Sequence, residues 1–328
     1  MFANRCRIGL LILLCIGRFN LILSSNSFLE YAVKEDSGKN YVIGYLFSNN
    51  TDFDEVRWDA LTHINIAFLY ANRDGTLNDL QIKKSLRQIV EIAHLNDVKI
   101  LVSLRDDDQG ELVKALTNNR SELIKNLIKF VEDYSLDGID FDFEDWERED
   151  VIPSVLAFVE EFDKNRGEDI LFTCAVNTWD RGYTNKWHTW FDIINVMAYD
   201  VHGPWNNEGQ HSPYEESLEA IKYWMNVLET PADKLTLGLP FYGYSWNEGD
   251  NAGQSYTYDQ ILKKYPKDAV ASNDNIEKIY YNGKCTIIVK TLWAKENNIA
   301  GVMIWQIAGD AKETEDSLLE AIGLIMKN

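Results

Sequence analysis

The sequence predicts a (β/α)8 barrel, the TIM-barrel architecture, with a small insertion between strands 7 and 8. Two observations predict this fold class: short β-rich runs alternate with amphipathic stretches along most of the chain, and eight such runs occur. This alternation implies parallel strands joined by right-handed helical crossovers. A doubly wound open sheet is the alternative, but the glycine-rich phosphate loop expected after one of its early strands is missing.

The expected strands are rich in β-branched and aromatic residues, as buried parallel strands are. In chain order they lie at about 41–47 (YVIGYLF), 62–69 (THINIAFL), 98–104 (VKILVSL), 137–143, 169–176, 192–199 (DIINVMAY), 234–241 (KLTLGLPF) and 299–305 (IAGVMIW). Between them apolar residues recur with the helical period, which predicts helices at about 81–95, 110–134, 151–165, 214–229, 286–297 and 313–326.

Strands 7 and 8 are separated by about 60 residues, more than one crossover helix needs. The dipeptide Asn282-Gly283 lies between strand-like flanks, which favours a hairpin turn. We therefore expect a small insertion at about 244–284 that walls one side of the active-site face. The catalytic barrel as a whole is expected to span 38–328.

Residues 1–25 have the pattern of a signal peptide. Arg5 and Arg7 precede an apolar run at 8–16, and two serines follow at 24–25. The run is short for a membrane span, and no A-x-A cleavage site is present, so an uncleaved anchor stays open as an alternative. The expected location is secreted or extracellular, or periplasmic or cell-surface if the segment is retained.

The amino-acid composition limits the classes of partner that the chain can bind. The 328 residues carry a formal net charge of −20, and removal of residues 1–25 would make it about −23. A nucleic-acid partner is therefore not expected, because phosphate backbones are bound through basic patches. A neutral substrate would not be repelled by this negative charge. No Cys/His metal spacing occurs, so no metal or cofactor is predicted, and we expect a monomer.

Three carboxylates share one face of the expected fourth strand. Asp140, Asp142 and Glu144 stand at positions i, i+2 and i+4, with apolar residues alternating between them. Three negative charges this close repel one another, so some of these carboxyls must be protonated or meet a cation. The pattern predicts either proton chemistry or, as an alternative, a Mg²⁺ or Ca²⁺ site, since hard cations prefer clustered oxygens.

Other reactive residues collect where the expected strands end, which is where barrel active sites lie. Ser103 closes strand 3, Tyr199 and Asp200 follow strand 6, and Trp305 closes strand 8. Four more tryptophans fall just beyond strand ends, where they suit either sugar stacking or loop packing: Trp146, Trp179, Trp205 and Trp246.

Several motifs resemble glycoside hydrolase family 18, the chitinases and endo-β-N-acetylglucosaminidases. Residues 137–144 (DGIDFDFE) match the DGxDxDxE signature of that family, and 197–200 (MAYD) match its MxYD motif. Shorter matches occur in barrel order at Gly44-Tyr45, Ala67-Phe68, 238–243 and 301–305. The likeness extends from about 41 to 325.

The resemblance implies a secreted, retaining endo-glycosidase that hydrolyses β-1,4-linked N-acetylglucosamine by substrate-assisted catalysis. Glu144 would be the general acid, kept protonated by neighbouring carboxylates. Asp142 and Tyr199 would hold the acetamido group of the substrate, and Asp140 with Ser103 would support Asp142. The remaining residues implied to bind the sugar are Trp305, which would be its apolar floor, Asp200, Met197, Tyr45, Phe68 and Tyr242.

The chain departs from the family pattern at two places. The third strand of the family ends in SxGG, whereas this chain has Arg105 and Asp106 at the glycine positions. Side chains there would narrow or re-aim the subsites and add charge. Tyr244 stands where many chitinases carry an arginine. Altered substrate preference is expected.

Two alternatives to chitin hydrolysis stay open. One is an endo-β-N-acetylglucosaminidase acting on N-glycans. The other is a non-catalytic, chitinase-like lectin, because this barrel persists as a sugar-binding protein when the acid is lost. The retained Glu144, Asp142 and Tyr199 argue against the lectin.

Overall fold

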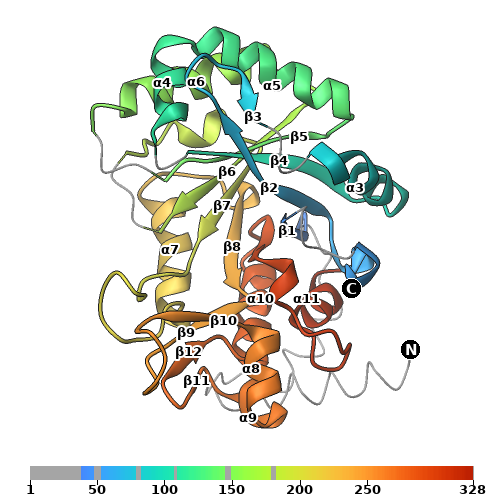
Figure 1. The fold of residues 1–328 in the computed structure, drawn as a ribbon, viewed down its shortest axis with the longest axis vertical. Coiled ribbons are helices and arrows are strands. Elements are labelled where there is room, and N and C mark those ends of the chain that lie inside the picture. Colours follow the sequence, from blue (N-terminus) through green and yellow to red (C-terminus); the bar gives the residue numbers. More distant parts are fainter. Residues whose placement is uncertain are drawn as a thin grey trace.

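The predicted barrel is confirmed in the computed structural model, which describes residues 38–47, 53–78, 83–106, 109–144, 149–178 and 182–327 (Figure 1). Eight parallel strands hydrogen-bond in a ring that the pairing of the first strand with the second closes. In chain order they are β1 (Tyr41–Phe47), β2 (His63–Ala71), β4 (Lys99–Arg105), β5 (Gly138–Asp142), β6 (Leu171–Asn177), β7 (Ile193–Met197), β8 (Leu235–Pro240) and β13 (Gly301–Trp305). A two-residue strand, β3 (Leu77–Asn78), pairs antiparallel with β2.

Helices surround the ring (Figure 1). They are α3 (Lys83–Leu95), α4 (Glu111–Asn118), α5 (Arg120–Tyr134), α6 (Ile152–Asn165), α7 (Tyr214–Asn226), α10 (Lys284–Glu296) and α11 (Leu318–Met326). The single helix expected at 110–134 is wrong, because the chain leaves helical geometry at Asn119, where φ is −134°. The Asn119 side chain donates instead to the Arg73 carbonyl at 2.8 Å.

The insertion between β8 and β13 is a four-stranded antiparallel sheet with two short helices (Figure 1). It contains β9 (Tyr242–Ser245), β10 (Gln254–Thr257), α8 (Tyr258–Lys264), α9 (Lys267–Ser272), β11 (Asn275–Ile276) and β12 (Ile279–Tyr281). The hairpin predicted at Asn282-Gly283 is wrong. The β11–β12 turn is at Glu277 and Lys278, both with positive φ, and Gly283 is the N-cap residue that precedes α10.

The core has an apolar layer outside the ring and a mixed layer within it, where buried polar side chains lie beside an apolar cluster that includes Ile43 and Met303. Phe141 of β5 points outward and packs on Phe158 of α6, with ring centroids 5.2 Å apart. Asp140, the preceding residue, points inward and is fully buried. The alternation predicted for this strand is therefore present. No described helix is long and apolar enough to cross a membrane, and residues 1–25 lie outside the described part of the chain.

Candidate active site

Asp140 is held inside the barrel by donors from four strands. Its Oδ2 accepts hydrogen bonds from the Tyr45 hydroxyl (2.6 Å) and the Ser103 hydroxyl (2.8 Å). Its Oδ1 accepts from the hydroxyl of Thr173 (2.6 Å) and the amide of Asn195 (3.4 Å). Burial raises the pKa of Asp140, and these donors act against the shift. Strand register explains the arrangement, because Ser103 and Thr173 are the direct neighbours of Asp140.

Asp142 and Glu144 lie above Asp140 and line a cleft of about 1380 Å³. Asp142 is only 3% exposed. Burial, and then the negative charge of Glu144, raise the pKa of Asp142 well above its ordinary value. Oδ1 of Asp142 is buried and has no hydrogen-bond partner among the described residues. Glu144 is more open, with its side chain 36% exposed.

Arg105 is the cation beside this pair. It is the last residue of β4, and its Cα lies opposite that of Asp142 in the register. Its guanidinium is 3.0 Å from Oε1 of Glu144 (Nη2) and 3.7 Å from Oδ2 of Asp142 (Nη1). The same group lies 4.7 Å above the centre of the Phe68 ring. β4 thus ends at Arg105, one residue beyond the end predicted at 104.

Aromatic rings cover the wall that faces the pair. Trp305 ends β13, and its ring stacks on Phe68 with centroids 5.6 Å apart and planes 20° apart. The Tyr45 ring lies 5.5 Å from the same indole. Tyr199 is 8% exposed, and its hydroxyl contacts the sulfur of Met303 at 3.7 Å. Burial raises the pKa of Tyr199 well above its ordinary value, so it stays a neutral donor.

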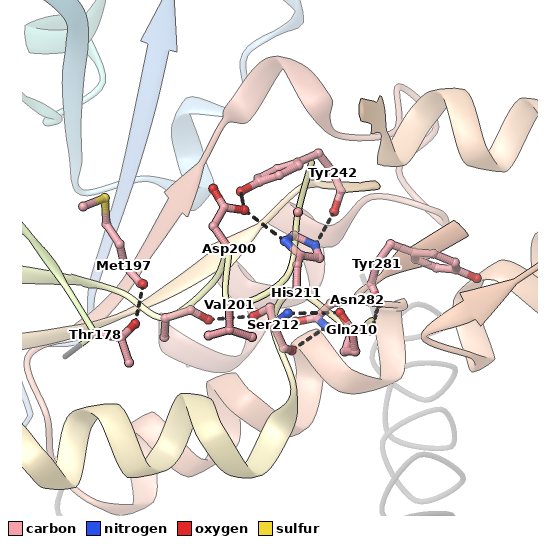
Figure 2. Close-up of polar contacts among 12 residues, drawn as sticks. Thr178, Met197, Asp200, Val201, Gln210, His211, Ser212, Tyr242, Tyr281 and Asn282 are labelled. Carbon is pink, nitrogen blue, oxygen red and sulfur yellow. Dashed lines mark hydrogen bonds and ion pairs between the residues drawn. The ribbon is translucent and has the colours of Figure 1, made fainter. Parts of the chain in front are cut away.

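Asp200 lies in the loop that follows β7, and the side chains of Tyr242 and His211 hold its carboxylate (Figure 2). Tyr242 donates its hydroxyl to Oδ1 of Asp200 at 2.5 Å, and His211 Nδ1 lies 3.2 Å from the same oxygen. His211 Nε2 lies 3.2 Å from the Tyr242 carbonyl. Met197, at the end of β7, receives the Thr178 hydroxyl at its carbonyl (2.9 Å) and lines the cleft with its side chain.

The structure thus brings together the residues selected from the sequence. Ser103 and Asp140 lie below the cleft, Phe68 and Tyr242 pack against its lining, and the others line it directly: Tyr45, Asp142, Glu144, Met197, Tyr199, Asp200 and Trp305. Their roles stay predictions. Trp205 also lines the cleft, and Trp246 packs on Tyr280 in the insertion. Trp146 and Trp179 lie outside the described residues.

Sequence reasoning missed several contributors. Thr173, Asn195 and His211 complete the hydrogen bonds of Asp140 and Asp200, and Glu149 lines the cleft. Period-two alternation on β6 and β7 could have placed Thr173 and Asn195 inside the barrel, since both belong to strands that were predicted. As for the metal alternative, no cluster of three or more His, Cys, Asp or Glu side chains able to hold a metal ion occurs among the described residues.

Comparisons with known proteins agree with this geometry. The model of the glycosyl hydrolases family 18 matches residues 40–310. The solved structure of a chitinase from Bacteroides thetaiotaomicron is 38% identical, with a TM-score of 0.82 over 87% of this chain and 96% of that one. A family 18 chitinase from Flavobacterium johnsoniae is 33% identical, with a TM-score of 0.78 over 88% and 94%.

A curated relative is more distant. The Drosophila melanogaster protein named probable chitinase 2 is 24% identical in an alignment that covers 60% of this chain and 53% of that protein. The chain therefore matches little more than half the length of that relative.

Proposed function

The chain belongs to the glycosyl hydrolases of family 18, and from this premise we propose that it hydrolyses β-1,4-linked N-acetylglucosamine, as in chitin and chitooligosaccharides, with retention of configuration. The observation that carries the proposal is the Asp142–Glu144 pair, which lines the same cleft as Tyr199 and Trp305. The names of the two similar solved structures, both chitinases, support the substrate class.

In the proposed reaction Glu144 gives its proton to the glycosidic oxygen as the bond between that oxygen and C1 breaks. The acetamido oxygen of the substrate attacks C1 and forms an oxazolinium ion, which is the substrate-assisted route. Water then adds to C1 as the bond between C1 and the acetamido oxygen breaks, and it loses a proton to the Glu144 carboxylate. Two displacements at C1 retain the configuration.

Two features of this chain suit the acetamido group. The buried Oδ1 of Asp142 has no partner among the described residues, so it can accept the acetamido N–H without giving up another bond. Among the described residues, the Tyr199 hydroxyl hydrogen-bonds to a weak acceptor, the Met303 sulfur at 3.7 Å, and can turn to the acetamido oxygen. Trp305 offers an apolar face for the sugar ring.

The substitution Glu144→Gln tests the proposal, because glutamine keeps the shape of the side chain but has no proton to donate. We expect product release from chitopentaose to fall by at least about 100-fold while oligosaccharide binding persists. Glu160→Gln, an exposed change on α6, is the matched control and should be fully active. Full activity of Glu144→Gln would contradict the proposal.

The same assay separates the alternatives. The enzyme and Glu144→Gln are compared on chitopentaose and on a high-mannose glycoprotein. Release from the glycoprotein alone would indicate an endo-β-N-acetylglucosaminidase, and binding of chitin without any release would indicate a lectin. Secretion is likewise proposed, from the pattern of residues 1–25, and a shortened chain in the culture medium would support it.

A further inference from the structure

Arg105 is a charged side chain inside the cleft that the proposed reaction does not use. We propose that Arg105 is a positioning residue that sets the alkaline limit of hydrolysis, because it favours loss of the proton that the Asp142–Glu144 pair must hold. This proposal rests on the proposed function, since it concerns the same proton donor. Arginine stays charged at any pH at which the enzyme is folded, so its influence is constant.

The geometry makes this influence direct. One guanidinium contacts both members of the pair, Glu144 at 3.0 Å and Asp142 at 3.7 Å. The guanidinium also lies 4.7 Å from the centre of the Phe68 ring, a cation–π contact that helps to hold it beside the pair. The side chain is 30% exposed, so water screens the interaction only in part.

The remaining charged and titratable neighbours among the described residues are acids, phenols and the thiol of Cys174. Asp106 accepts the backbone N–H of Glu144 at 3.3 Å, and its charge opposes ionisation of the pair. Around the pair, the groups from the surrounding strands and loops are Tyr45, Asp140, Glu149, Cys174, Tyr199 and Asp200. Among the described residues that line the cleft, Arg105 is the only cation.

Arg105 does not make the cleft a site for anionic sugars. Two carboxylates already face the guanidinium, and Glu149 and Asp200 add negative charge to the same lining. An acidic substituent on the substrate would meet a net negative surface. The charge of Arg105 therefore acts on the pair and not on the ligand.

The consequence is a shift in the pH dependence. Hydrolysis needs the pair to carry one proton, and activity falls on the alkaline side when that proton is lost. A cation within 4 Å favours the ionised form, so it moves this fall to lower pH. Removing the cation should let the pair keep its proton to higher pH.

The test is the pH profile of kcat/KM for four proteins. Arg105→Met removes the charge at similar length, and its alkaline limb should lie about one pH unit above that of the unchanged enzyme. Arg105→Lys keeps a charge and should stay close to the unchanged limb. Asp106→Asn removes a negative neighbour and should move the limb in the opposite direction.

Opposite shifts for Arg105→Met and Asp106→Asn are a result that a merely structural role would not produce. An unchanged or lowered limb for Arg105→Met, in an enzyme that hydrolyses chitooligosaccharides normally, overturns the role of Arg105 and leaves the proposed function standing. If no protein of the series hydrolyses these substrates, the proposed function fails. Carbon NMR titration of the pair's carboxyls, assigned with Asp142→Asn and Glu144→Gln, then tests Arg105 without turnover.

Discussion

At the scale of single residues, Asp142 shows the conflict between folding and chemistry. It is 3% exposed, and burial followed by the charge of Glu144 raises its pKa well above the ordinary value. An acid whose folded pKa is raised stabilises the fold fully only below its unfolded pKa, about 3.9. That contribution is lost as the pH rises towards the folded pKa, so at neutral pH the buried carboxyl group is a cost.

Asp142→Asn should therefore stabilise the protein at neutral pH while impairing hydrolysis. We expect the free energy of unfolding at pH 7 to rise by about 1 kcal/mol or more, since one pKa unit corresponds to about 1.4 kcal/mol. Below pH 3.9 the difference should disappear, because both forms are then neutral. Urea denaturation at several pH values measures it, and a variant less stable than the unchanged protein at pH 7 would show that the charge is well compensated.

Asp140, Asp142 and Arg105 show how much of the site can be predicted from the sequence. The inward positions of Asp140 and Asp142 follow from the period of two in a strand, which needs no tertiary information. The ion pair of Arg105 does not follow from that period. It depends on β4 ending one residue later than predicted and on the register of β4 against β5. Ser103 donates to Asp140 inside the barrel, and Arg105, two residues later on β4, shares that face.

At the scale of elements, eight strands were predictable because buried parallel strands are continuous apolar runs. The errors occurred where local signals compete with packing. Asn282-Gly283 is a strong hairpin signal, but the β-branched residues after it form the buried face of α10. The helix propensities of β-branched residues differ little from one another, so packing in the folded protein decides whether they form a helix or a strand.

Lys290 on α10 links that helix to the site. Its buried amino group lies within hydrogen-bond distance of four oxygens: the Ser212 carbonyl and hydroxyl, the Ser217 hydroxyl and the Asn282 side chain, each at 2.8 or 2.9 Å. The Ser212 hydroxyl in turn donates to the Ala198 carbonyl at 2.7 Å, next to Tyr199. Figure 2 shows Ser212 of this loop beside Asn282, whose side-chain amide donates to the Ser212 carbonyl at 2.9 Å.

Lys290→Met should destabilise the protein by about 3 kcal/mol, because several buried acceptors lose their donor at once. The loop that carries Tyr199 and Asp200 should loosen as well, which we expect to raise KM. Denaturation midpoints and steady-state kinetics measure both effects. Lys222→Met, an exposed change on α7, is the control and should lie within about 0.5 kcal/mol of the unchanged protein. Equal stability of the two variants would refute the role of Lys290.

At the scale of the whole molecule, the chain has a formal charge of −20, and among the described residues that line the cleft four acids face one cation: Asp142, Glu144, Glu149 and Asp200 against Arg105. A negative field of this kind attracts cationic ligands and leaves neutral ones unaffected. Fully acetylated chitooligosaccharides are neutral, whereas partly deacetylated ones carry protonated amines.

KM for partly deacetylated oligosaccharides should therefore rise several-fold as the ionic strength goes from about 0.01 M to about 1 M, because the screening length falls from about 30 Å to about 3 Å. KM for the fully acetylated oligosaccharide of equal length, which serves as the matched neutral ligand, should change less than about two-fold over the same range. Initial rates at each salt concentration provide the measurement. If salt affects both ligands equally, it acts on the protein or on sugar packing, and the charge of the cleft does not contribute to substrate capture.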